Sequence, residues 1–201
     1  MAPRDGRCKV NMKDISLIGF MGCGKSSVGK ILATLLPECR LIDLDTYIEE
    51  KQGKNIPEIF NEYGEAAFRR MEREALEEIF SDKSRPRAIL SLGGGTVTSE
   101  QCRQLIRQHT DCFYLRATTD TLLSNLEGHS DGRPMLNPTQ PVEAQSTETS
   151  SEREALRHRI ESLMQTRSPQ YIATAHHIID IDGLSFTQIA EAVEDNILNI
   201  K

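Results

Sequence analysis

Short apolar runs alternate with amphipathic stretches along almost the whole chain. Five runs have strand length, and the stretches between them carry apolar residues at helical spacing. This alternation is typical of a mostly parallel sheet with helices on both faces. The predicted strands are residues 14–18, 40–43, 88–92, 112–115 and 177–181. The predicted helices are residues 25–36, 45–51, 56–62, 67–80, 100–109, 118–126, 152–173 and 186–200.

The helix predicted at 67–80 shows the pattern clearly, because one of its faces is apolar and is expected to be core. That face holds Phe68, Met71, Ala75, Leu76 and Ile79. Residues 137–151 break the pattern, since this polar segment has almost nothing to bury. We expect a mobile loop there, which serves as a lid or a spacer.

Length and charge limit the classes of function. The chain has 201 residues and a formal net charge of −6, which predicts one compact domain over residues 13–201 after a polar extension over residues 1–12. A mildly acidic protein is a poor match for nucleic acid or an anionic membrane. No apolar run has the length of a membrane span. Any binding of phosphate must therefore be local.

The cysteines indicate a reducing compartment. There are five, at positions 8, 23, 39, 102 and 112, without a CxxC pair or a Cys/His cluster. A cytoplasmic location is therefore expected. The basic N-terminus followed by an apolar run up to Cys23 also has a superficial likeness to a lipoprotein signal, but the apolar run is very short.

The strongest chemical signal is residues 19–26, GFMGCGKS, which match GxxxxGK[ST] between a predicted strand and a predicted helix. Glycines let the loop bring backbone N–H groups against phosphate oxygens. Lys25 then supplies a positive charge to the phosphates of ATP, and the Ser26 hydroxyl is a ligand for Mg²⁺. Cys23 is interpreted as a small filler within this loop. The alternative is a glycine-rich turn that binds nothing.

Two further signals follow predicted strands, at the sheet edge where open α/β proteins bind ligands. Asp43 and Asp45 end the second strand, although Asp45 also suits a helix N-cap. Gly93, Gly94 and Gly95 follow the third strand and favour a ligand lying directly on the main chain, or else a plain turn.

Three arginines are candidate anion ligands. Arg69 and Glu72 are spaced i, i+3 on one predicted helix, so the carboxylate can hold the guanidinium toward an outside anion, although such pairs are often ordinary surface pairs. Arg133 stands just before the polar loop and suggests a lid residue. Arg167 lies in the sequence TRSPQY.

Taken in order, the motifs GxxxxGKS, DxD, FRxxE, LGGG, RP and RxPxY resemble those of the shikimate kinases, which are P-loop kinases of the nucleoside-monophosphate kinase type. The resemblance covers residues 14–182. It implies a three-layer P-loop NTPase fold with a five-stranded parallel sheet in the order 2-3-1-4-5. It also implies a substrate-binding region at about 44–80, a mobile lid at about 127–152, and phosphoryl transfer from ATP to shikimate on the route to chorismate and the aromatic amino acids.

The resemblance also implies residue roles. Residues 22–27, which include Gly22, Gly24 and Ser27, would cradle ATP. Ser26 and Asp43 would hold Mg²⁺, with Asp43 acting through water. Asp45 would lie beside the attacking hydroxyl. The remaining contacts would come from Arg69 and Arg167 to the shikimate carboxylate, from the Gly93–Gly95 backbone to the ring hydroxyls, and from Arg133 to the transferring phosphoryl group.

The chain departs from the family pattern at three points, and alternatives stay open. An arginine usual before the lid is replaced by the sequence SNLE at 124–127, the polar loop is longer, and Ser27 stands where threonine is commoner. Another P-loop kinase, such as a gluconate kinase, and a nucleotide-binding regulatory module without turnover are the rivals. Family resemblance favours a monomer.

Overall fold

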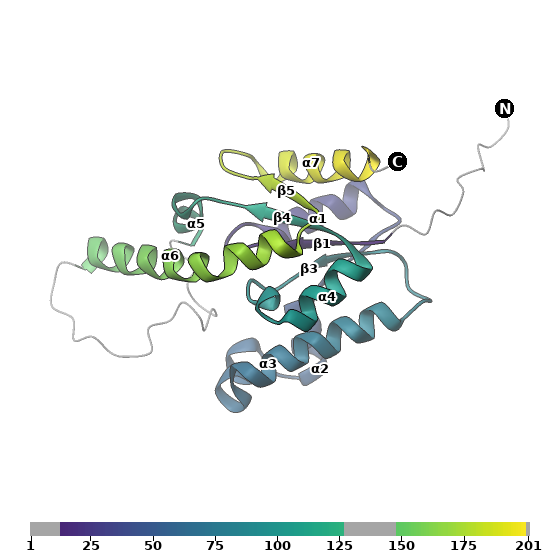
Figure 1. Cartoon of the computed structure of the whole chain (residues 1–201), viewed down its shortest axis with the longest axis horizontal. Coiled ribbons are helices and arrows are strands. Elements are labelled where there is room, and N and C mark those ends of the chain that lie inside the picture. The colour runs from purple at the N-terminus through teal and green to yellow at the C-terminus, as the bar shows by residue number, and fades with distance from the viewer. Residues whose placement is uncertain (1–12, 127–147, 200–201) are drawn as a thin grey trace.

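The computed structural model describes residues 13–126 and 148–199, with the backbone alone for residues 148–151. Its centre is a parallel sheet with the strand order β2-β3-β1-β4-β5 (Figure 1). This is the order that the family resemblance implies. The strands are β1 (Asp14–Ile18), β2 (Arg40–Asp43), β3 (Ala88–Ser91), β4 (Thr110–Arg116) and β5 (His177–Asp180).

Helices cover both faces of the sheet, because side chains on both faces of the central strands are apolar. In β4, Phe113 and Leu115 join one buried cluster with α1 and α7, whereas Cys112 and Tyr114 join a second cluster with α3 and α4. This gives the predicted three layers. The helices are α1 (Lys25–Leu35), α2 (Leu44–Gln52), α3 (Ile56–Ser81), α4 (Glu100–His109), α5 (Thr119–Leu126), α6 (Glu148–Thr174) and α7 (Phe186–Asn199).

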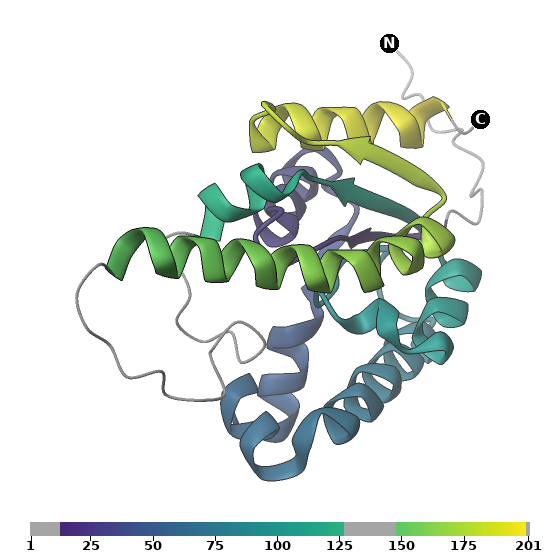
Figure 2. The ribbon, with the colours of Figure 1, turned by 60° about the vertical axis from the view of Figure 1, so that its left-hand side comes forward.

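The apolar face predicted for residues 67–80 belongs to α3. Phe68, Ala75, Leu76 and Ile79 are buried, and Met71 is partly buried against the same cluster. Gly64 interrupts α3 with a non-helical conformation (φ 76°, ψ 170°), which accounts for the two separate helices predicted there. Together, α2 and α3 form a unit at one end of the sheet (Figure 2).

Some predicted ends were wrong, and one short element was missed. β4 covers Thr110–Arg116 and not only residues 112–115. The helix expected from residue 152 begins at Glu148, so the last residues of the predicted polar loop are helical. The sequence ETSSE contains residues that are neutral in an N-terminal turn, so composition alone did not mark this start. A short 3₁₀ turn, Thr96–Thr98, was not predicted. The predicted N-terminal extension, the remainder of the predicted lid up to residue 147, and Arg133 lie outside the described residues.

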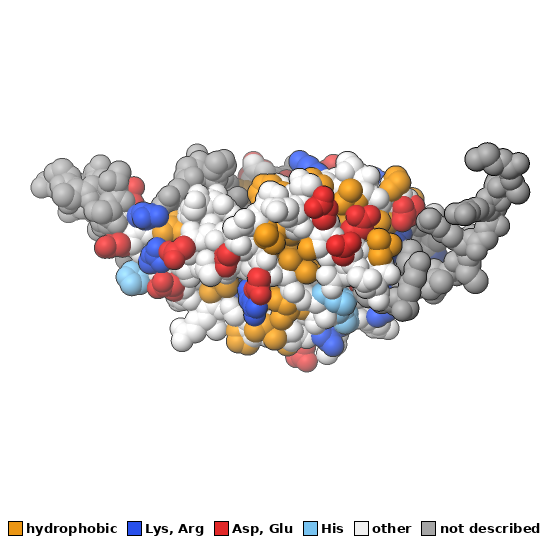
Figure 3. Space-filling model, turned by 90° about the horizontal axis from the view of Figure 1, so that it is seen from above, with side chains coloured by type: hydrophobic (Ala, Val, Ile, Leu, Met, Phe, Trp, Pro, Cys, Tyr) orange, Lys and Arg blue, Asp and Glu red, His pale blue; other side chains and the backbone are white. Residues whose placement is uncertain are grey.

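The face over β5 and α7 mixes apolar and acidic side chains (Figure 3). Its exposed large hydrophobic residues include Ile178, Leu184, Phe186 and Leu198. Within the part of the chain that the structure describes, no helix has both the length and the apolar character needed to cross a bilayer.

Candidate active site

The segment from β1 to α1 folds as a phosphate-binding loop. Gly22 and Gly24 have φ angles of 84° and 87°, a left-handed conformation that glycine adopts at little cost. A Cβ atom on Gly24 would lie only 2.5 Å from the Phe186 ring. Cys23 is fully buried and fills space inside the loop, as predicted. The N-terminus of α1 therefore opens toward the position where a phosphate group would bind.

Lys25 is the first residue of α1, and its side chain is buried. Its ammonium donates hydrogen bonds to the carbonyl oxygens of Gly19 at 2.9 Å and Phe20 at 3.0 Å. Its third donor points to Cys23 Sγ at 3.8 Å, and sulfur is a weak acceptor that a phosphate oxygen would replace. The loop thus holds the positive charge of Lys25 in a fixed place.

Three side-chain oxygens gather next to the loop. The Ser26 hydroxyl donates to Asp43 Oδ2 at 2.7 Å and lies 3.1 Å from the Ser91 hydroxyl. Asp43 also caps α2, because its Oδ1 accepts a hydrogen bond from the Thr46 amide. The sequence left open whether Asp45 caps this helix. It does not, because Asp45 lies within the first turn of α2. Hydroxyl and carboxylate oxygens are ligands that Mg²⁺ prefers, so this group of oxygens fits the ion.

Asp45 forms an acidic pair with Glu72 beside Gly93. A Cβ atom on Gly93 would lie 2.9 Å from Asp45 Oδ1, 3.0 Å from Glu72 Oε1 and 3.1 Å from the Thr96 hydroxyl. A Cβ atom at this position would force these side chains to shift, so the position favours glycine. Burial, followed by the negative charges of Glu72 and Asp43, raises the pKa of Asp45 to about 7. Among the described residues, Asp45 Oδ1 is buried without a hydrogen-bond partner, so it can accept a bond from a ligand.

Two carboxylates hold the guanidinium of Arg69, which lies on α3. One of them is Glu72, as predicted. The guanidinium donates to Glu72 Oε2 at 2.6 Å and to Glu65 Oε1 at 2.9 Å. Glu72 is fully buried, and burial raises the pKa of its carboxyl group. The guanidinium lies against Gly95, where a Cβ atom would be 2.2 Å from Nη2. The third glycine is thus needed to admit this arginine.

Arg167 approaches the same glycines from α6. It is buried, its Nη1 lies 3.4 Å from the Gly94 carbonyl oxygen, and its guanidinium lies 5.9 Å from the centre of the Phe20 ring. The Tyr171 hydroxyl donates to the same Gly94 oxygen at 2.5 Å. The two predicted arginines therefore both lie against the triple glycine, Arg69 at Gly95 and Arg167 at Gly94.

These groups surround a cleft of about 530 Å³ at the carboxyl ends of the strands. Arg69, Arg167 and Gly95 lie next to the lining rather than in it. Sequence reasoning missed five lining residues. Met21, Ser91 and Leu92 lie within or beside the predicted motifs, Asn125 lies in the stretch before the predicted lid, and Phe186 carried no signal. The lining consists of Met21, Gly22, Gly24, Lys25, Ser26, Ser27, Asp43, Asp45, Ser91, Leu92, Gly93, Gly94, Asn125 and Phe186.

Comparison with known proteins identifies the family. A family model described as shikimate kinase matches residues 21–197. A shikimate kinase of Thermus thermophilus is 34% identical over 183 residues, which cover 91% of this chain and 89% of the relative. That of Chlorobaculum tepidum is 40% identical over 158 residues, covering 79% and 76%. The chain belongs to the shikimate kinase family.

Solved structures of shikimate kinases share the fold. The enzyme from Acinetobacter baumannii in complex with shikimate has a TM-score of 0.78 and 30% sequence identity, covering 94% of this chain and 95% of that one. The enzyme from Bacteroides thetaiotaomicron has a TM-score of 0.78 and 28% identity, covering 93% and 99%. The predicted family, fold and class of ATP-dependent kinase are confirmed, and the family match decides against a gluconate kinase.

The end of the cleft beside the phosphate-binding loop differs from the pattern that the resemblance implies. Where the sequence lacks the usual arginine, Asn125 Nδ2 donates to the Gly22 carbonyl oxygen at 2.9 Å. Phe186, at the start of α7, lies with its ring against Gly24 and is 43% exposed. A neutral amide and an aromatic ring therefore form this end of the cleft.

Proposed function

We propose that this protein transfers the γ-phosphoryl group of ATP to the 3-hydroxyl of shikimate, giving shikimate 3-phosphate and ADP. The observation that carries the proposal is that Lys25, Ser26, Asp43 and Asp45 line one cleft. The family match supports shikimate as the acceptor. The product would enter the chorismate route to aromatic amino acids. The four described cysteines are free thiols, which agrees with a cytoplasmic location.

In this proposal the loop and Lys25 bind the phosphates of ATP. The loop amides and the N-terminus of α1 receive the phosphate oxygens. Ser26 and Asp43 would hold Mg²⁺, with Ser91 keeping the Ser26 hydroxyl in place at 3.1 Å. When bound, the ion neutralises charge on the β- and γ-phosphates. Positioning and charge neutralisation provide most of the rate enhancement in phosphoryl transfer.

The acceptor would lie between Asp45 and the two arginines. Arg69 and Arg167 flank the triple glycine, and a pair of guanidinium groups suits a single carboxylate. Asp45 Oδ1, which is buried and available as an acceptor, would take a hydrogen bond from the attacking hydroxyl. With a pKa of about 7, Asp45 can also receive that proton as the bond to phosphorus forms.

In this proposal the adenine ring would lie against Phe186. The ring of Phe186 adjoins Gly24, and aromatic stacking suits the flat face of a base. Asn125, already bonded to Gly22, would line the other side. Arg133, which lies outside the described residues, remains the predicted lid residue that neutralises charge on the transferring group.

An ADP-release assay with separate acceptors tests the proposal. Shikimate, quinate, gluconate and a nucleoside monophosphate are offered at equal concentration with ATP and Mg²⁺. We expect turnover with shikimate at least tenfold above that with each of the others. Turnover with gluconate but not with shikimate would overturn the assignment, and ADP release that no acceptor stimulates would favour a non-catalytic nucleotide-binding module.

A further inference from the structure

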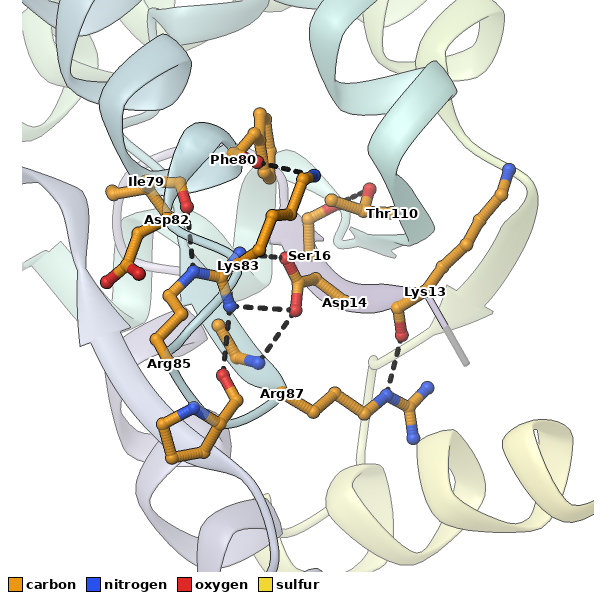
Figure 4. A network of polar contacts seen from close by, with 12 residues as sticks. Lys13, Asp14, Ser16, Ile79, Phe80, Asp82, Lys83, Arg85, Arg87 and Thr110 are labelled. Atoms are coloured by element: carbon orange, nitrogen blue, oxygen red, sulfur yellow. Dashed lines mark hydrogen bonds and ion pairs between the residues drawn. The ribbon is translucent and has the colours of Figure 1, made fainter. Parts of the chain in front are cut away.

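A second cleft lies at the opposite edge of the sheet, where the strands begin. It has a volume of about 480 Å³, which falls within the range of small-molecule sites. Its walls come from the start of β1, the segment between α3 and β3, and the end of α4 (Figure 4). It is lined by Lys13, Asp14, Phe80, Asp82, Lys83, Arg85, Pro86, Arg87, Gln108 and His109. We call it the basal cleft.

The basal cleft is positively charged in a protein whose net charge is −6. Its lining has four Lys and Arg residues against two aspartates. One cation is neutralised, because Arg85 forms a two-point ion pair with Asp14 and also donates to the carbonyl oxygens of Ile79 and Pro86. Asp82 accepts hydrogen bonds from Ser84. Those bonds lower the pKa of Asp82, which keeps its negative charge, so the lining as a whole stays net positive, with Lys13, Lys83 and Arg87 as its cations outside the Arg85–Asp14 pair.

Arg87 has one unpartnered nitrogen although its side chain is only 10% exposed and also makes a side-chain hydrogen bond with the Cys39 thiol. Its Nε donates to the Lys13 carbonyl oxygen at 2.6 Å. The Asp111 carboxylate lies 3.8 Å from Nη2, which is too long for a hydrogen bond. Among the described residues, Nη1 is buried and has no partner. Buried guanidinium donors are normally satisfied, so an acceptor for this group is missing.

The two lysines act on a common neighbour, His109. Burial, followed by the positive charges of Lys83 and Lys13, lowers the pKa of the imidazole. His109 stacks on Phe80 with ring centres 4.8 Å apart, and the Lys83 ammonium donates to the Phe80 carbonyl oxygen at 2.8 Å. Lys83 is thereby fixed beside the imidazole, with two further donors on its ammonium.

We propose that the basal cleft is an anion site for a phosphate group, either inorganic phosphate or a small phosphate monoester, bound by Lys13, Lys83 and Arg87. Three cations with spare donors match a dianion with three acceptor oxygens better than they match a single carboxylate. The cleft is at the opposite end of β1 from the phosphate-binding loop, so the anion would not compete with ATP. The proposal does not depend on the acceptor used in the catalytic cleft.

Histidine NMR signals provide the test. The protein is saturated with ADP, so that the phosphate-binding loop is occupied, and is titrated with inorganic phosphate or glycerol 3-phosphate against sodium chloride at equal ionic strength. The His109 signal is assigned with His109→Gln. A bound anion should raise the pKa of His109 by about 0.5 to 1 unit, in a saturable way.

A double variant, Lys13→Gln with Lys83→Gln, should lose this saturable shift, and both side chains are exposed, so folding is not at risk. Lys30→Gln removes an exposed lysine on α1 and should keep the shift. A response to inorganic phosphate alone would assign the free ion, and a response to both compounds would assign the phosphate group in general. A shift no larger than that in chloride, or an equal shift in the double variant, would overturn the proposal.

Discussion

Replacing Thr96 with valine should impair both stability and shikimate binding. The Thr96 hydroxyl donates to Glu72 Oε1 at 2.5 Å, and both residues are fully buried. Glu72 Oε2 accepts from Arg69 at 2.6 Å. Valine has nearly the same shape but lacks the donor, so Thr96→Val leaves one carboxylate oxygen of Glu72 buried and unpartnered.

The size of the effect follows from this lost bond. A buried hydrogen bond to a charged group contributes about 1.5 to 3 kcal/mol, which corresponds to a decrease in Tm of roughly 3–12 °C for a protein of this length. The hydrogen bond from Thr96 also lowers the pKa of Glu72, whereas burial raises it. Without this bond Glu72 is more readily protonated, its pair with Arg69 weakens, and the KM for shikimate should rise about fivefold to tenfold.

Thermal unfolding and steady-state kinetics measure the two effects. Thr96→Ser restores the hydroxyl and should recover the KM for shikimate. Thr98→Val is the matched control, because Thr98 donates to the neutral Gly95 carbonyl at 2.7 Å in the same turn. It should leave the KM for shikimate unchanged. Equal KM values for Thr96→Val and wild type, or a rise in the KM for ATP instead, would refute the role given to Thr96.

Four further predictions concern the catalytic cleft. Asp45→Asn should lose most turnover while isothermal titration still shows ATP binding; near-normal turnover would contradict the role of Asp45. Because the folded-state pKa of Asp45 is raised to about 7, its stabilising contribution is full at pH values below its ordinary pKa and is lost as pH rises toward 7. Between pH 5 and 8, urea unfolding should therefore show wild type losing about 2–3 kcal/mol relative to Asp45→Asn; parallel pH profiles would exclude this ionisation. Ser91→Ala should raise the Mg²⁺ concentration for half-maximal activity a few-fold, and an unchanged Mg²⁺ titration would remove Ser91 from the site. Phe186→Ala should raise the KM for ATP about tenfold, as expected for loss of one stacking contact, and an equal rise in the KM for shikimate would argue against stacking on adenine.

The strands could be predicted from sequence because each is a short run that holds adjacent apolar residues between helical stretches. In a parallel sheet covered on both faces, almost every position of a central strand is buried, as in Ala88–Ser91. Strand order could not be read from the apolar pattern, because the pattern does not say which strands are neighbours. It came from the family resemblance.

The parts of the candidate site that could be predicted are those in which one short motif contains all the interacting residues. The phosphate-binding loop and the Arg69–Glu72 pair are local in sequence, and the structure confirms their geometry. Thr96 and Ser91 were missed because their partners, Glu72 and Ser26, lie 24 and 65 positions away. Such contacts exist only after the strands and helices have packed.

Phosphate placement on the product tests the central claim most directly. The protein is incubated with ATP, Mg²⁺ and shikimate, and the product is examined by ³¹P and ¹H NMR. The account predicts a single phosphate monoester, coupled to the proton on carbon 3 of shikimate, in equal amount to ADP. ADP formed together with inorganic phosphate and no shikimate ester, or an ester at another hydroxyl, would contradict it.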